Sequence, residues 1–319
     1  MATALSNLGH LCHMQGEYAA ARERYEECLS IRRELGDLHD IATSLTSLGS
    51  ILDMIGNSTE AERIFEENLA ITREIGDLPL VSTALVNLGR VASYRGDYER
   101  ARELSEEALR ITKAIGDRRL LAQVYQSRGA IAFQEEDFGT AYEAYLQSLE
   151  LREQLEDRRA AGHSLAGLGY TACLRGDFEL ARRHLDDSLR AGRETGDLPG
   201  VSYALSGLGY LASELGDLDE SERCLEDGLG IALRSGDPVV TVVTLEGLGT
   251  VHCGRGDFRS AVRCLAAAGA IRERVLDADE SIRPTQARVV SRPRPDRPRR
   301  RGEFRLRGPR GEPRARKSS

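Results

Sequence analysis

The sequence predicts an all-α protein in which seven helix pairs stack into a right-handed α-solenoid. The main observation is a forty-residue repeat without insertions, marked each time by a glycine that follows leucine in six of seven copies. Repeats of this kind are typical of stacked helical units. Tryptophan is absent and aromatic residues make up 5% of the chain, which suits closely packed helices better than a β-sandwich. The marker glycines are Gly9, Gly49, Gly89, Gly129, Gly169, Gly209 and Gly249.

Short turns divide each unit into two helices. A pair such as Gly96-Asp97 follows the marker glycine, and a second pair such as Gly36-Asp37 closes the unit. Glycine enters the left-handed conformation at a helix C-terminus without a Cβ clash, and Asp or Asn accepts hydrogen bonds from the free N–H groups of the next helix. Asn57 with Glu60 even has the spacing of a capping box. Each unit is therefore predicted to be a first and a second helix joined by tight turns.

The marker glycine predicts a close helix crossing. A glycine inside a helix costs roughly 1 kcal/mol relative to alanine, so its recurrence in all seven copies indicates a steric need. A single helix pair cannot bury its apolar face alone, whereas stacked pairs share a continuous core. We expect the first helices to line the inner, concave surface and the second helices to lie outside. In the second unit the apolar stripe of the first helix consists of Ile41, Leu45, Leu48, Ile51, Leu52 and Ile55.

The repeat sets the predicted domain boundaries. The solenoid is expected over residues 1–276, with repeats at about 1–36, 37–76, 77–116, 117–156, 157–196, 197–236 and 237–276. Residues 277–319 are expected to form a disordered Arg/Pro-rich tail, because residues 283–319 hold thirteen arginines, one lysine and six of the nine prolines without an apolar period. Three interpretations of this basic tail stay open: a solvated segment, an arm that binds nucleic acid or an acidic partner, and out-of-frame translation.

The motif resembles the tetratricopeptide repeat (TPR) family. Leu-Gly in the first helix, an aromatic residue such as Tyr98 at the start of the second, and an alanine such as Ala101 three residues later match its pattern. The long forty-residue units are similar to those of LGN/Pins-type adaptors and of the sensor regions of bacterial MalT/AfsR-like regulators. The resemblance implies a right-handed solenoid that binds other proteins. An asparagine that usually follows the glycine in LGN-type repeats is replaced here, for example by Ser50 and Arg90.

The sequence contains none of the motifs that would indicate an enzyme, a cofactor or a metal site. A phosphate-binding P-loop, a dinucleotide-binding GxGxxG, a zinc-protease HExxH and a GxSxG elbow are all missing. The chain has only two lysines, Lys113 and Lys317, and its six cysteines form no CxxC pair. It also has no stretch of about 18 apolar residues and no secretory signal. We therefore expect a non-catalytic cytoplasmic protein with reduced cysteines and no membrane contact.

The leading functional prediction is a scaffold that binds a peptide or helix of a partner protein on its concave surface. The resemblance to the TPR family implies that positions before and after the marker glycine face this groove, and their tyrosine and arginine side chains are favoured in interfaces. The alternative for Tyr170 and Tyr210 is packing against neighbouring first helices. The predicted groove residues are Thr46, Ser50, Asp53, Asn87, Arg90, Tyr94, Gln126, Tyr170, Tyr203, Ser206 and Tyr210.

Two other functions stay open. The chain is alternatively the sensor or regulatory part of a larger signal-transduction ATPase or transcriptional regulator, as the MalT/AfsR resemblance implies. A third interpretation is nucleic-acid binding through the basic tail alone. The remainder of the chain would repel phosphate, because residues 1–282 carry 30 basic and 48 acidic side chains.

Overall fold

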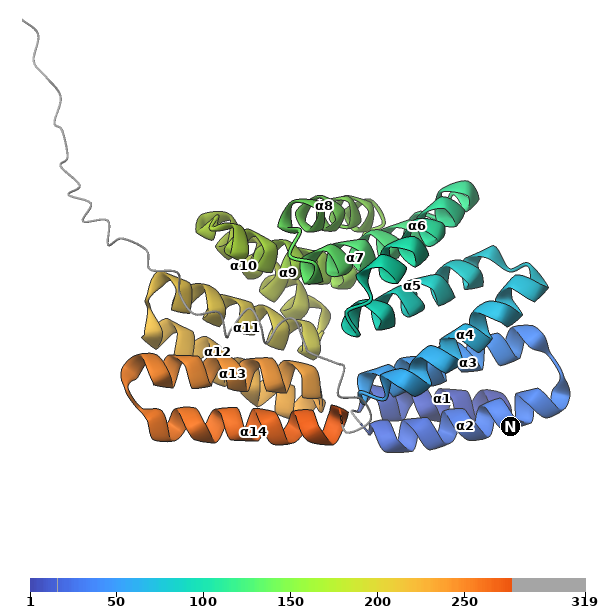
Figure 1. Cartoon of the computed structure of the whole chain (residues 1–319), viewed down its shortest axis with the longest axis horizontal. Coiled ribbons are helices and arrows are strands. Elements are labelled where there is room, and N and C mark those ends of the chain that lie inside the picture. The colour runs from blue at the N-terminus through green and yellow to red at the C-terminus, as the bar shows by residue number, and fades with distance from the viewer. Residues whose placement is uncertain (16, 277–319) are drawn as a thin grey trace, which may run out of the picture.

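The computed structural model describes residues 1–15 and 17–276, which form fourteen α-helices and contain no strand (Figure 1). The predicted all-α fold of seven helix pairs is confirmed. The predictions about residues 277–319, including their disorder, lie outside the described residues. The helices are α1 (Ala2–Met14), α2 (Tyr18–Leu35), α3 (Leu38–Met54), α4 (Ser58–Ile75), α5 (Leu78–Tyr94), α6 (Tyr98–Ile115), α7 (Arg118–Gln134), α8 (Phe138–Gln154), α9 (Arg158–Arg175), α10 (Phe178–Thr195), α11 (Leu198–Leu215), α12 (Leu218–Ser235), α13 (Pro238–Arg255) and α14 (Phe258–Leu276).

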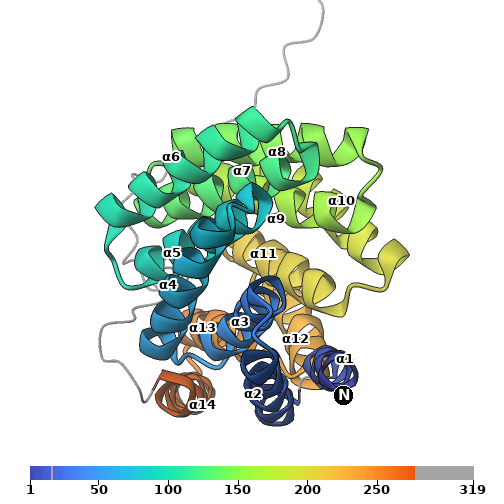
Figure 2. The ribbon, with the colours of Figure 1, turned by 90° about the vertical axis from the view of Figure 1, so that its right-hand side faces the viewer.

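The helix pairs coil into a right-handed superhelix that makes about one turn. Figure 2 shows the chain passing once around the superhelix axis from α1 to α14. Consecutive odd-numbered helices from α3 to α13 contact one another as well as the even-numbered helices, so they form the inner layer. The two ends of the turn approach each other. Asp237 at the start of α13 is near enough to Tyr18 at the start of α2 to influence the pKa of its hydroxyl group. Burial and, to a smaller extent, this carboxylate raise the pKa of Tyr18 to about 12.

The helix ends follow the glycine and capping pattern of the sequence. Gly36 ends α2 in the left-handed conformation at φ 77°, and the carboxylate of Asp37 accepts the backbone N–H groups of His39 and Asp40. Two turns have glutamate in place of the glycine. Glu136 and Glu156 take positive φ values of 65° and 55° there. These two residues adopt a conformation that side chains with a Cβ normally avoid.

Six of the seven helix pairs are held by one bulky side chain of the second helix that lies against the marker glycine of the first. A Cβ atom built on Gly49 would lie 2.5 Å from the Phe65 ring, and one on Gly129 would lie 2.7 Å from the Tyr145 ring. The same side chains press on the next repeat: a Cβ on Gly167 would lie 2.8 Å from Tyr145. We call these side chains wedge residues; they are Tyr25, Phe65, Tyr145, Leu185, Leu225 and Leu265.

The third repeat lacks a wedge residue. Ser105 occupies the wedge position, and a Cβ on Gly89 would meet nothing closer than the Ala101 carbonyl oxygen at 3.4 Å. The expectation that all seven marker glycines are sterically required is therefore wrong at Gly89. The apolar core divides nearby: one large cluster ends at Ala108 and Val124, and the next begins at Ala132.

Helix crossings with and without a wedge residue predict opposite effects of replacing the marker glycine by alanine. Gly89→Ala should leave the free energy of unfolding unchanged or raise it by up to about 1 kcal/mol, because alanine favours the helix and the Cβ has room. Gly129→Ala should lower it by about 1–3 kcal/mol, because the Cβ overlaps the Tyr145 ring. Urea unfolding of both variants measures the difference. Equal shifts of the two midpoints would contradict the wedge packing.

The missing wedge also leaves a buried hydroxyl group without a partner. The Ser105 hydroxyl makes no hydrogen bond, whereas the Ser148 hydroxyl donates to the Ala122 carbonyl oxygen at 2.8 Å. Ser105→Ala should stabilise the protein by about 1 kcal/mol by removing a desolvated polar group, and the matched variant Ser148→Ala should destabilise it by about 1 kcal/mol. Thermal or urea unfolding tests this, and a destabilising Ser105→Ala would show that its hydroxyl is satisfied.

Candidate partner-binding surface

The predicted groove residues lie on five neighbouring helices of the inner layer. Thr46, Ser50 and Asp53 come from α3, and the rest come from α5, α7, α9 and α11. Helical spacing of three to four residues along each helix brings the members of one helix onto one face. The structure thus places these positions, which come from segments far apart in the chain, on neighbouring inner helices.

Among these residues, Arg90 of α5 pairs with Asp53 of α3. The Asp53 carboxylate is nearly inaccessible, with 4% of its side chain exposed, whereas 32% of the Arg90 side chain is exposed. Tyr94, one turn further along α5, hydrogen-bonds Arg90. Burial lowers the pKa of Arg90, while Tyr94 acts in the opposite direction. Because Asp53 compensates the guanidinium charge, the centre of the surface carries little net charge.

Tyrosines from several helices form the other part of the surface. The rings of Tyr170 and Tyr203 lie 4.8 Å apart between centroids, and the Tyr170 hydroxyl donates to the Tyr203 carbonyl oxygen at 3.3 Å. Tyr145 interacts with both Tyr94 and Tyr203, and Tyr170 also with Tyr210. Burial raises the pKa of Tyr145 and of Tyr170 well above the ordinary tyrosine value. The tyrosine cluster therefore stays uncharged near neutral pH.

The predicted residues differ in how far a partner would reach them. Asn87, Tyr170 and Ser206 are buried, and the Ser206 hydroxyl is hydrogen-bonded to Thr244 at 2.8 Å. Tyr170 packs against Tyr203 of the next inner helix, as the alternative for this residue predicted. The three buried side chains support the surface, and their contact with a partner stays a prediction. The Asp53 side chain is nearly inaccessible. The remaining members are partly or well exposed: Thr46, Ser50, Arg90, Tyr94, Gln126, Tyr203 and Tyr210.

Sequence reasoning missed Tyr145 because it belongs to the outer helix α8. Its ring reaches the inner layer through the gap that Gly129 and Gly167 leave. The available signal was Gly167, a second glycine two residues before the marker Gly169. Such a pair leaves room for a large side chain of the preceding repeat.

A polar cluster lies where α9 meets the start of α11. Asp197, the residue before α11, accepts hydrogen bonds from Arg159 at 3.0 Å and from His163 at 2.8 Å. Unlike Asp157, which accepts from the Ala160 N–H, its carboxylate caps no backbone group of its own helix. Burial alone would raise the pKa of Asp197, but the His163 hydrogen bond and the charge of Arg159 outweigh it, and the pKa lies below its usual range.

The lowered pKa of Asp197 predicts a pH-dependent contribution to stability. The ionised carboxylate stabilises the folded chain above its unfolded-state pKa of about 3.9, and this contribution is lost as the pH falls through the lower folded-state value. Asp197→Asn should reduce the free energy of unfolding at neutral pH by about 1–3 kcal/mol. The difference between wild type and variant should shrink in acid. Urea unfolding at several pH values measures it, and a pH-independent difference would contradict the assignment.

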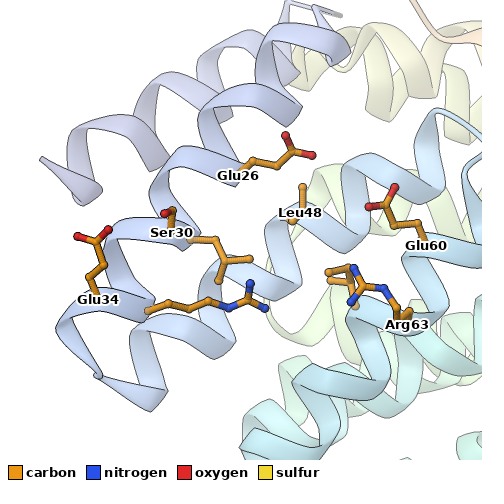
Figure 3. A pocket seen from close by; sticks show the side chains of 9 residues that line it. Glu26, Ser30, Glu34, Leu48, Glu60 and Arg63 are labelled. Carbon is orange, nitrogen blue, oxygen red and sulfur yellow. The ribbon is translucent and has the colours of Figure 1, made fainter.

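A hollow of about 500 Å³ lies on the outer side between α2 and α4 (Figure 3). Its apolar lining, Leu29, Leu48 and Ile64, belongs to the core, and charged side chains such as Glu60 and Arg63 surround it. Within the described part of the chain, no cluster of His, Cys, Asp or Glu side chains is placed to hold a metal ion, and no helix is long and apolar enough to cross a membrane. The inner surface is the better candidate for partner binding, because it combines tyrosines with a partly exposed arginine.

Sequence profiles of the tetratricopeptide repeat match residues 1–74, 55–114 and 160–234, and a second profile of the same description matches residues 241–280. This chain belongs to the tetratricopeptide repeat family. A search of the curated proteins found no match for this TPR chain. The family therefore rests on the repeat profiles, which agree with the forty-residue unit and the helix pairs.

Several solved structures share the fold at low sequence identity. A Rap protein complexed with Competence and Sporulation Factor has a TM-score of 0.74 and 13% identity, covering 86% of this chain and 76% of that chain. A plasmid Rap conjugation gene regulator in complex with the Phr* peptide has a TM-score of 0.70 and 15% identity, covering 86% of this chain and 74% of that chain. A STAND ATPase with a TPR sensor from Pyrococcus horikoshii has a TM-score of 0.59 and 13% identity, covering 86% of this chain and 41% of that chain. These similarities establish a shared TPR architecture.

Proposed function

We propose that this TPR protein is a non-catalytic scaffold that binds a peptide or helix of a partner protein on its inner surface. The observation that carries the proposal is the contrast between constant core positions and varied inner positions. The residue before the marker glycine is leucine in six repeats, whereas the residue after it is Ser50, Arg90, Ala130 and Tyr170 in four consecutive ones. Packing demands the same side chain in each repeat, while a non-repetitive ligand demands different ones.

The chemistry of the surface favours a weakly charged partner segment. Tyr94 and Tyr210 offer aromatic faces with a hydroxyl group, a combination that is enriched in binding sites. Arg90 is compensated by Asp53 but keeps about a third of its side chain exposed, so it has N–H groups to offer a peptide carbonyl. We infer a partner segment with apolar or aromatic anchors and neutral polar groups between them, bound in the cytoplasm.

Two Rap structures support this proposal, because they combine a similar architecture with a bound factor in one case and a bound peptide in the other. The STAND ATPase supports a second candidate, in which this chain is the sensor part of a larger signal-transduction protein. Both candidates use the inner surface for recognition. They differ in what the bound partner then controls.

Peptide selection from a displayed library against the whole chain, followed by calorimetry with the selected peptide, tests the proposal. Tyr94→Ala and Tyr210→Ala should each weaken binding by about 1–4 kcal/mol if these side chains anchor the ligand. Arg110→Ala is the matched control, because Arg110 is an exposed residue of the outer helix α6 and should bind as wild type.

Circular dichroism should show unchanged helicity and unfolding for all three variants. Wild-type affinity of both tyrosine variants together with weaker binding by Arg110→Ala would move the binding surface to the outer helices. A displayed library that yields no ligand for the wild-type chain would argue against peptide recognition altogether.

A further inference from the structure

The last helix carries an apolar face that no part of the described chain covers. Leu265 is a wedge residue with 46% exposure, whereas its equivalent Leu225 in the preceding repeat is 3% exposed. Val262, one turn earlier, is 64% exposed. We call this surface the α14 face; it consists of Phe258, Val262, Leu265 and Ala266, all exposed. Inside the solenoid the corresponding surface is covered by the following repeat.

The first repeat carries the complementary face. Leu11 of α1 is 56% exposed, although its equivalent Ile51 in the second repeat is fully buried. Leu8 is exposed as well, whereas its equivalent Leu48 is buried. Inside the solenoid these positions pack against the preceding repeat. We call this surface the α1 face; it consists of Leu8, Leu11, Gln15 and Ala20.

Charged contacts mark the junctions between repeats inside the solenoid. The residue equivalent to Val262 makes a polar contact with the following repeat in all six earlier repeats. Examples are Arg22 with Glu60 at 3.4 Å and Arg182 with Glu220 at 2.7 Å. The six equivalents are Arg22, Glu62, Arg102, Tyr142, Arg182 and Glu222, and their contacts include Glu62 with Arg100, Arg102 with Glu135, Tyr142 with Arg175 and Glu222 with Arg255.

The two outer faces lack these charges on both sides. Val262 replaces the polar residue of the other repeats, and Ala266 stands where five of the six earlier repeats have an acidic residue. On the α1 face, Ala20 stands at the position of Glu60, and Gln15 at the position of Glu135. The polar partners are therefore missing on both faces at matching positions. An uncompensated charge at either face would have made the contact unfavourable.

We propose that a second copy of this chain docks its α1 face on the α14 face of the first, as an eighth repeat in the same superhelical sense. Leu265 then fills the place that the internal wedge residues fill, and Leu8 and Leu11 leave water. The contact is head-to-tail, so each copy keeps one free face and association continues beyond the dimer. The proposal is independent of peptide binding, because the inner surface stays open in every copy.

Sedimentation velocity of the whole chain over a wide concentration range tests the contact. The wild type should sediment as dimers and larger species that dissociate on dilution. Val262→Glu disables the α14 face, Leu11→Glu disables the α1 face, and each variant alone should be monomeric. An equimolar mixture should form a dimer and nothing larger, because each variant retains the face that the other lacks. Both sites are more than half exposed, so folding is expected to be unaffected, and circular dichroism checks this.

Gln147→Glu is the matched control, since Gln147 holds the position of Ala267 on the outer surface of the fourth repeat. This variant should associate as wild type does. A wild-type chain that stays monomeric at every concentration would overturn the proposal. So would a Leu11→Glu variant that still dimerises, because it would indicate pairing of two α14 faces, and so would a mixture of the two variants without dimers.

Discussion

The fold depends on one steric relation: in six of the seven repeats a bulky side chain of the second helix lies where the first helix has no side chain. The wedge residue touches the marker glycine of its own repeat and often the first helix of the next. It therefore sets both the crossing within a pair and the packing between pairs. Repeated six times, this contact fixes the path of the superhelix. The position of every residue on the inner surface follows from it.

The packing differs in the third repeat, which has no wedge residue. Ser105 leaves Gly89 without steric pressure and its own hydroxyl without a partner, and the apolar core divides nearby. This junction adjoins the centre of the inner surface, between Tyr94 of the third repeat and Tyr145 of the fourth.

The charged side chains are also distributed differently on the outer and the inner side of the solenoid. Within the solenoid, ion pairs such as Arg182 with Glu220 connect the outer edges of successive repeats. On the inner surface, Asp53 compensates Arg90 and the tyrosines stay neutral. The predicted groove residues therefore form a polar set with little net charge, because Asp53 and Arg90 are its only charged members. The α1 face and the α14 face are also uncharged. They expose aliphatic side chains at positions where polar residues meet at the junctions between internal repeats.

The sequence by itself determined the repeat, the helix pairs, their caps and the close crossings, because each depends on residues within a few positions or on their periodic recurrence. It also placed the inner residues on the correct helices, and the third-repeat exception was visible in the register as Ser105. Only the tertiary structure decided which side chains meet across repeats. Asp53 with Arg90, Tyr170 with Tyr203 and Asp197 with His163 are pairs separated by more than thirty residues. Their contacts depend on the angle between stacked repeats, and the wedge packing of the whole solenoid sets that angle.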